Sequence, residues 1–128
     1  MNRNILLIDD NELDIFVNRM VIKQDHLNDN IIDFLSATKA LSFLQEIASD
    51  SEKIPDMIFL DIMMPVMDGF GFLREFEKLP KLVLEKSKIV MLSSSTNLKD
   101  IEQANSNPYV IKFVNKPLTA SSLEKIYS

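Results

Sequence analysis

Residues 6–14 read LLIDDNELD, an apolar run that passes directly into a stretch with four acidic residues. A run this short and this apolar is typical of a strand covered on both faces, so the acids are expected where the strand ends. Asp9 and Asp10 are adjacent, and the stretch holds neither Lys nor Arg. Two carboxylates about 4 Å apart repel by roughly 4 kcal/mol at an effective dielectric near 20. Something must therefore offset the repulsion at this strand end.

Four more apolar runs occur further along the chain, and stretches with helical periodicity separate them. The five runs cover residues 4–8, 31–35, 57–60, 88–92 and 109–114. Most lack strict alternation of apolar and polar residues, as expected for parallel strands buried on both faces. Five repeats of strand then helix predict an α/β fold, (βα)5, with a doubly wound, five-stranded parallel sheet and right-handed crossovers.

The stretches between the runs carry apolar residues at the spacing of amphipathic helices. In the first, the stripe expected to face the core is Leu13, Phe16, Val17, Met20 and Val21. Ser36 and Asp68 are expected to cap the second and third helices. The apolar positions of these two helices are Ala37, Ala40, Leu41, Leu44, Ile47 and Ala48, and then Phe72, Leu73, Phe76 and Leu79. Two weaker helices are expected near residues 98–104 and 119–127.

Length and charge restrict the function classes. The 128 residues suffice for one domain, predicted over residues 1–128. A net charge of -5 without a basic stripe argues against a nucleic-acid partner. No cysteine is present, and no apolar run approaches the length of a membrane span. We therefore expect a cytoplasmic protein with no membrane partner.

The polar residues that follow the predicted strands are candidates for the site, because ligands of such sheets bind beyond the carboxyl ends of the strands. They are Asp9, Asp10, Asp61, Ser93 and Lys116. Three carboxylates in one concavity suit Mg²⁺, which takes one or two carboxylates, several waters and phosphate oxygens. A hydroxyl and an ammonium group opposite them would suit a phosphoryl group. The acids are thus explained as a site for Mg²⁺.

Four motifs in this order and spacing resemble the receiver domain of two-component response regulators. They are the acidic pair, FLDIMMPVMDG at 59–69, MLSSS at 91–95 and NKP at 115–117. The resemblance covers nearly the whole chain and implies the flavodoxin-like strand order 2-1-3-4-5. It also implies a phosphoacceptor switch in a two-component system or phosphorelay. The donor would be a sensor histidine kinase or a histidine phosphotransfer protein, and the sequence does not name the output partner.

The resemblance assigns the phosphoacceptor and the metal ligands. Asp61 would accept the phosphoryl group from a phosphohistidine. Asp9 and Asp10 would be the acidic pair that binds Mg²⁺, with Asp10 expected to be the more direct ligand. Asp61 and the backbone carbonyl of Met63 would complete the metal site. On this interpretation the protein is not an enzyme on other substrates and catalyses only its own phosphorylation and dephosphorylation.

The resemblance also assigns the residues that respond to the phosphoryl group. Ser93 would be the switch hydroxyl, Lys116 the lysine that contacts the phosphoryl group, and Phe113 the switch aromatic. The bond from Lys116 to Pro117 would be cis. Two positions that flank the attacking water in the family hold Met63 and Ser95 here, which predicts slow dephosphorylation. The chain departs from the family in EQANSNPYV before the fifth strand and in Asn115 before the lysine.

Other functions share part of this pattern. A Mg²⁺-dependent phosphohydrolase with an aspartyl nucleophile usually has a second acid two residues after the nucleophile, where this chain has Met63. A flavodoxin-like cofactor binder needs a phosphate loop after the first strand, whereas DDNELD is acidic. A receiver that has lost phosphorylation and serves in dimerisation would not need all five polar residues.

Taken singly, the candidate residues also have plain structural explanations. Adjacent aspartates are favourable at a helix N-terminus. Asp61 could be a turn residue, Ser93 a loop residue and Lys116 a solvated lysine. Phe113 could simply belong to the core, as aromatic residues usually do. His26, the one histidine, is expected on the surface.

Overall fold

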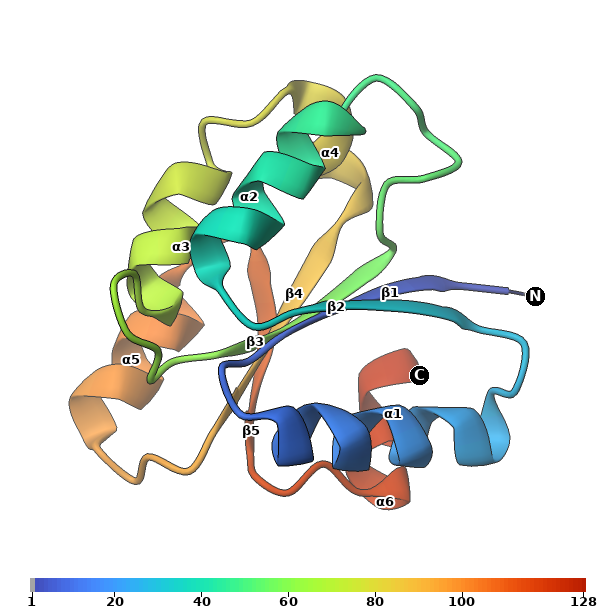
Figure 1. The fold of residues 1–128 in the computed structure, drawn as a ribbon. Helices are drawn as coiled ribbons and strands as arrows, with labels where there is room; N and C mark the ends of the chain where they lie inside the picture. The colour runs from blue at the N-terminus through green and yellow to red at the C-terminus, as the bar shows by residue number, and fades with distance from the viewer. Residues whose placement is uncertain (1) are drawn as a thin grey trace.

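The computed structural model describes residues 2–128, so residue 1 of the predicted domain lies outside the described residues. Strands and helices alternate along the chain, except that two helices separate the third and fourth strands (Figure 1). Among residues 2–128, no helix is both long and apolar enough to cross a membrane. The elements are β1 (Asn4–Ile8), α1 (Glu12–Asp25), β2 (Asn30–Phe34), α2 (Ala37–Glu46), β3 (Met57–Asp61), α3 (Gly69–Phe76), α4 (Lys81–Lys86), β4 (Lys88–Ser93), α5 (Leu98–Ser106), β5 (Val110–Asn115) and α6 (Ala120–Tyr127).

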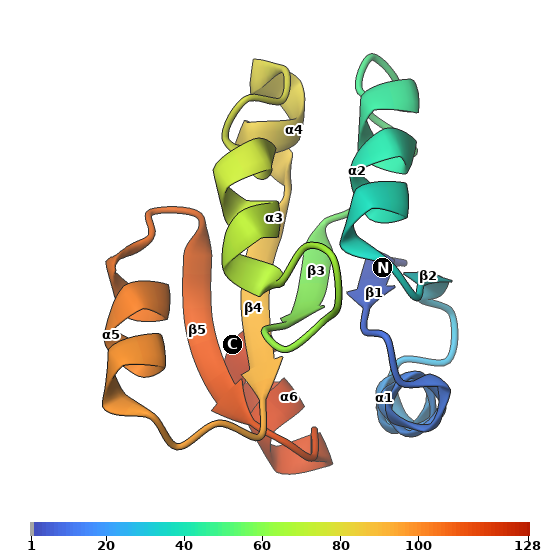
Figure 2. The same cartoon turned by 60° about the vertical axis from the view of Figure 1, so that its left-hand side comes forward.

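The strands form one parallel sheet with the order β2-β1-β3-β4-β5, which confirms the predicted fold class and strand order. The register aligns Ile8 with Leu60 and Ser93 with Asn115. The carboxyl ends of these strands therefore lie side by side across the sheet. Figure 2 shows the arrowheads of β3, β4 and β5 directed toward the same edge.

Helices cover both faces of the sheet, and each face has its own apolar core (Figure 1). One core lies under α2, α3, α4 and α5 and includes the fully buried Phe72 and Phe76. The other lies under α1 and α6 and includes Ile22 and Leu123. Because both faces are covered, β3 is buried along its whole length, as its uninterrupted apolar sequence predicts.

Helix α1 presents to the core a face that only partly matches the predicted stripe, of which Val17 and Val21 are partly buried and Val21 packs against the core. Its buried residues are Ile15, Asn18 and Ile22. Leu13, Phe16 and Met20 of the predicted stripe are 68%, 58% and 58% exposed. The helix carries two apolar stripes, and periodicity alone does not distinguish between them. Packing against the sheet and α6 selects the narrower stripe that contains the two isoleucines.

The other helices follow their sequence signals more closely. Ser36 and Asp68 cap α2 and α3 through hydrogen bonds to backbone N–H groups, as predicted. The predicted apolar residues of these two helices are buried. The short helix α4 was not predicted, because it follows Pro80 without a side-chain cap and spans only Lys81–Lys86.

A tight loop joins β3 to α3 and fixes the backbone after Asp61. The N–H of Met67 donates to the carbonyl of Pro65 (2.8 Å), and Val66 between them has a φ of 71°. Such a three-residue turn is strained for a β-branched residue. After this turn the chain passes close to the end of β3 at Gly69. A Cβ added to Gly69 would lie 2.5 Å from the carbonyl oxygen of Asp61. Only glycine fits this close approach without moving the backbone that carries Asp61.

Candidate functional site

Three aspartates meet at the carboxyl edge of the sheet. One carboxylate oxygen from each of Asp9, Asp10 and Asp61 lies within 4.8 Å of the other two. Asp9 and Asp61 are buried, at 3% and 6% exposure, whereas Asp10 is exposed. The parallel register produces this arrangement, because β1 and β3 are neighbours, Asp9 directly follows β1 and Asp61 is the last residue of β3. The structure thus brings together the three predicted acids.

The ammonium group of Lys116 lies among the acids. Its Nζ is 2.8 Å from Asp9 Oδ2 and 3.4 Å from Asp61 Oδ1. It also donates to Asp14 Oδ2 at 2.7 Å. Only 16% of the Lys116 side chain is exposed, so little water screens these contacts. The lysine therefore offsets much of the repulsion among the acids.

Burial changes the acid strength of Asp61. Desolvation, followed by the nearby charge of Asp9, raises the pKa of Asp61 to about 6, although Lys116 opposes the shift. The unusual pKa reflects the position of a carboxylate at the end of a strand buried on both faces. Near neutral pH, most Asp61 carboxyl groups are still ionised and able to act as nucleophiles.

The same surroundings keep Lys116 charged. Burial by itself lowers the pKa of an ammonium group, but hydrogen bonds to Asp14 and Asp9 outweigh burial and raise the pKa of Lys116 above its ordinary value. The lysine is therefore positively charged near neutral pH. Three carboxylates contact this single ammonium group, and Asp10 lies next to two of them, so the site keeps an excess of negative charge.

The ends of β4 and β5 place the remaining predicted residues. Ser93 is fully buried, and its hydroxyl accepts a hydrogen bond from the N–H of Ser95 (3.0 Å). The carbonyl of Ser93 accepts from the N–H of Lys116 (2.9 Å), which joins the two strand ends. The peptide bond between Lys116 and Pro117 is cis. The Lys116 side chain reaches back across the sheet, where its ammonium group contacts Asp9 and Asp61.

Phe113 and Met63 lie at the margins of the site. Phe113 is half-buried on β5 and packs against the core under α5. Met63 lies two residues after β3 and is 68% exposed, so it offers a thioether to solvent at this edge. The hydroxyl of Ser95 donates to Asp100 Oδ2 (2.8 Å). These positions are compatible with the predicted roles but do not by themselves assign them.

Sequence reasoning left one participant without a role. Asp14 was noted as part of the acidic stretch but not assigned, and it makes the shortest contact with Lys116. The sequence feature that could have pointed to Asp14 is its place in the first turn of α1, the turn that follows the N-cap Asn11. Side chains in a first turn lie near the preceding strand end, which is where Lys116 arrives from β5. The position of the Lys116 side chain over α1 could not be predicted from the sequence.

The donor set fits a hard divalent cation. Octahedral Mg²⁺ with bonds near 2.1 Å holds its ligand oxygens about 3 to 4 Å apart. The oxygens of Asp9, Asp10 and Asp61 are already within 4.8 Å of one another, so small side-chain rotations suffice. All three donors are carboxylates, and one of them is open to solvent, where water ligands can enter. The chemistry of this site therefore suits Mg²⁺.

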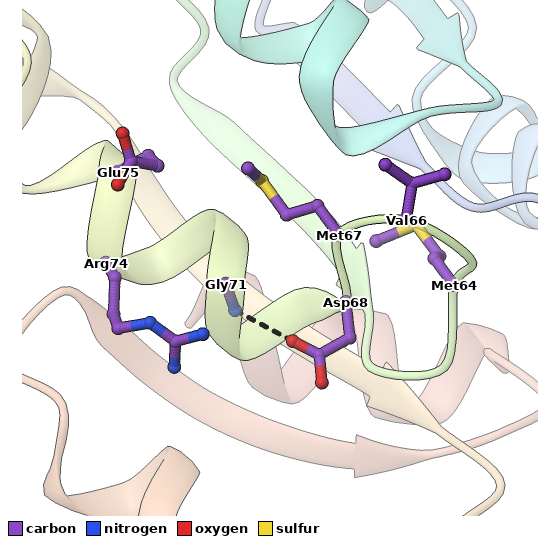
Figure 3. A pocket seen from close by; sticks show the side chains of 7 residues that line it. All are labelled: Met64, Val66, Met67, Asp68, Gly71, Arg74 and Glu75. Atoms are coloured by element: carbon purple, nitrogen blue, oxygen red, sulfur yellow. Dashed lines mark hydrogen bonds between the residues drawn. The ribbon is translucent and has the colours of Figure 1, made fainter.

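A separate hollow lies beside the loop after β3 (Figure 3). Its lining consists of Met64, Val66, Met67, Asp68, Gly71, Arg74 and Glu75. The carboxylate of Asp68 accepts from the N–H of Gly71 (2.8 Å), a bond that caps α3. None of the predicted acids lines this hollow, and neither does Lys116. The phosphate chemistry suggested by the acids therefore belongs to the strand ends and not to this hollow.

Comparisons by sequence and by structure point to one family. The model of the response regulator receiver domain matches residues 5–128. The two-component response regulator ORR8 of Oryza sativa subsp. indica is 33% identical over 97 residues, which are 76% of this chain and 72% of that protein. The solved structure of a two-component response regulator from Cytophaga hutchinsonii has a TM-score of 0.89 and 30% identity, covering 99% of this chain and 94% of its own. That of the phosphorylated cyanobacterial phytochrome response regulator RcpA has a TM-score of 0.78 and 27% identity, covering 98% and 89%.

Proposed function

Because the chain belongs to the response regulator receiver domain family of two-component signalling, we propose that Asp61 is its phosphoacceptor. The observation that carries the proposal is the convergence of Asp9, Asp10, Asp61 and Lys116 at one edge of the sheet. Asp61 is buried, and its pKa is raised to about 6. A carboxylate with a raised pKa is a better nucleophile, yet it stays ionised near neutral pH.

The reaction exchanges one bond to phosphorus for another. An oxygen of the Asp61 carboxylate forms a P–O bond while the P–N bond of a phosphohistidine breaks, and the imidazole leaves with the bonding electron pair. Such a loose transfer needs alignment and charge neutralisation more than covalent help. Lys116 provides one positive charge within reach of the transferred group.

Asp9, Asp10 and Asp61 would hold Mg²⁺, together with the backbone carbonyl of Met63. When bound, the metal ion supplies further positive charge to the phosphoryl oxygens. The chain itself contributes the orientation of the carboxylates. The N–H of Asn11 donates a hydrogen bond to the Asp9 carboxylate (2.9 Å). Gly69 packs closely against the backbone of Asp61 and so restricts its position.

The output is a change in the surface that a partner binds. Phosphorylation replaces the single negative charge of the Asp61 carboxylate with a phosphoryl group that carries about -1.5 to -2 units of charge and three strong acceptors. Ser93 and Lys116 are drawn toward these acceptors, and Phe113 moves into the space that Ser93 leaves. The affected face consists of α5, β5 and α6, which pack next to the site.

Receiver domains work with histidine kinases, and we propose that such a kinase, or a histidine phosphotransfer protein, is the donor here. The donor has to bring its phosphohistidine to Asp61, so it covers the surface around the strand ends. Leu13 and Phe16 are exposed on the first turns of α1, beside Asp10 and Asp14. Apolar side chains left in solvent at this place favour contact with a protein rather than with a small molecule.

The intact mass after incubation with acetyl phosphate tests the assignment of Asp61. The wild-type protein is expected to gain one phosphoryl group with Mg²⁺ and none with EDTA. The Asp61→Asn variant is expected to gain none, because an amide is not a nucleophile here. Asp25→Asn, a change at an exposed aspartate at the far end of α1, is the matched control and keeps full labelling.

Labelling of Asp61→Asn to the wild-type extent would refute the assignment. The same experiment addresses the alternative of a Mg²⁺-dependent phosphohydrolase. Such an enzyme would release phosphate from acetyl phosphate continuously, without lasting labelling. Met63, whose exposed thioether occupies the position of the second acid, cannot protonate a leaving group, and this disfavours the alternative.

A further inference from the structure

Lys116 is shared among three carboxylates, and the closest one has no role in the proposed reaction. The distances from Nζ are 2.7 Å to Asp14, 2.8 Å to Asp9 and 3.4 Å to Asp61. An ammonium group has three N–H donors, so each carboxylate can take one. The lysine is thus bound more closely to Asp14 than to the proposed phosphoacceptor.

Asp14 differs from the other acids in what it can contact. It does not belong to the group whose oxygens lie within 4.8 Å of one another, which consists of Asp9, Asp10 and Asp61. Its carboxylate projects from the first turn of α1, and its N–H donates to the side chain of the N-cap Asn11 (3.2 Å). The backbone of Asp14 is therefore anchored at the start of the helix. Its carboxylate contacts the lysine but does not belong to the candidate metal site.

We propose that Asp14 is a positioning residue that shares the ammonium group of Lys116 and restrains its closer approach to Asp61 until the phosphoryl group arrives. This inference rests on the proposed function. To neutralise the transferred group, the ammonium must give up part of its bond to Asp14 and move toward Asp61. An interaction present before the reaction and lost in the transition state raises the barrier. Asp14 therefore slows phosphorylation by weak, small donors.

The rate of labelling by acetyl phosphate at saturating Mg²⁺ tests this role. Asp14→Asn is expected to raise the limiting rate about three- to tenfold, as loss of one charge-assisted hydrogen bond from the ground state would. Glu12→Gln is the matched control, because it removes the same charge from the same helix turn. It is expected to change the rate less than twofold. Equal acceleration in both variants would overturn the proposal, since it would reflect net charge alone.

A second measurement follows the lysine directly and needs no phosphorylation. In protein labelled with ¹⁵N at lysine side chains, a protected ammonium signal is expected for Lys116, assigned by its loss in Lys116→Ala. Asp14→Asn should shift the signal or broaden it through faster exchange with water, and Glu12→Gln should leave it unchanged.

The two measurements separate the possible failures. An ammonium signal unaffected by Asp14→Asn would overturn the contact itself. A wild-type protein that takes no label from acetyl phosphate would overturn the proposed function and the kinetic role with it. Restored slow labelling in Asp14→Glu, which returns a carboxylate to the same helix turn, would support the proposal. Rapid labelling of that variant would contradict it.

Discussion

At the scale of single residues, the chemistry of the site follows from burying carboxylates beside one lysine. Asp61 loses hydration at the end of β3, and the charge of Asp9 adds to the cost of ionising it. Lys116 reduces that cost but does not remove it, because it also contacts Asp9 and Asp14. The metal-free protein therefore holds Asp61 as a weaker acid than a solvated aspartate.

This has a consequence for stability against pH in EDTA. The pKa of Asp61 is near 3.8 in the unfolded chain and about 6 in the folded protein, so the folded protein binds the proton more tightly. The resulting stabilisation is fully present below pH 4 and is lost as the pH rises through 6. The Asp61→Asn variant has no carboxyl group at this position and does not lose this stabilisation. Its free energy of unfolding, relative to that of the wild type, should therefore increase by about 2 kcal/mol between pH 4 and pH 7.

Urea unfolding of both proteins at several pH values measures this difference. Asp25→Asn, with its exposed aspartate, should track the wild type throughout. A difference between Asp61→Asn and wild type that does not depend on pH would show that Asp61 titrates normally.

Met63 is expected to make the phosphorylated form long-lived. A thioether can neither orient nor deprotonate the water that attacks the aspartyl phosphate, so general-base help is missing. The hydroxyl of Ser95 is engaged with Asp100. Met63→Asn should therefore shorten the half-life of the phosphorylated protein several-fold, as measured by loss of the added mass after removal of acetyl phosphate.

Met63→Leu is the control for this variant, because it changes the shape of the side chain without adding a polar group. Its half-life should match that of the wild type. A half-life that is unchanged or longer in Met63→Asn would count against the role of this position.

At the scale of elements, α1 separates two tasks between its faces. Ile15 and Ile22 pack on the sheet, and Leu13, Phe16 and Met20 remain in solvent. Burial of the narrower stripe leaves the bulkier one available next to the site. The helix thereby provides both an anchor for the fold and an apolar surface at the place where the proposed donor would approach.

The two faces should differ in their response to truncation. Ile22 is completely buried, so Ile22→Ala is expected to lower the free energy of unfolding by about 2 to 4 kcal/mol. Met20 is 58% exposed, so Met20→Ala should change it by less than about 1 kcal/mol. Denaturant melts of the two variants and the wild type provide the comparison. Equal losses would mean that α1 is rotated relative to the structure described here.

At the scale of the whole molecule, the site exists only when the sheet is complete. Lys116 and Asp9 are 107 positions apart in the chain, yet they form an ion pair of 2.8 Å. Every strand that contributes a site residue also contributes to the core, so Mg²⁺ binding and folding should be linked. A change at Asp10 distinguishes the effect on Mg²⁺ binding from the effect on folding, because Asp10 is exposed and contributes little to the core.

Mg²⁺ should therefore stabilise the wild-type protein more than Asp10→Asn. The stabilisation of the wild type should reach about 2.7 kcal/mol at a Mg²⁺ concentration 100 times its Kd. In EDTA, the variant should be at least as stable as the wild type, because one of the crowded negative charges is gone. Melts in EDTA and in excess Mg²⁺ test both expectations, with Asp25→Asn as a control that gains as much as the wild type. A variant that is less stable in EDTA and gains equally from Mg²⁺ would mean that Asp10 is only a structural residue of the turn.

Much of this architecture could be read from the residues alone. The apolar runs predict the strands because a strand covered on both faces has no polar side to display, and LLIDDNELD shows where such a strand ends. Once five strands are parallel, their carboxyl ends share one edge, so Asp9, Asp10, Asp61 and Lys116 had to lie near one another. The N-caps Ser36 and Asp68 could also be predicted from the sequence, since capping depends on residues within one turn.

What only the tertiary structure decided depends on contacts between distant segments. Two stripes of α1 are apolar, and the choice between them is made by the shape of the sheet and by α6. The bond from Lys116 to Asp14 requires knowing how far a side chain from β5 reaches over β1. The exposure of Asp10 beside the buried Asp9 likewise depends on which way the chain turns after β1. Sequence patterns report the periodicity and the ends of elements, whereas the packing of one element on another selects which side chains meet.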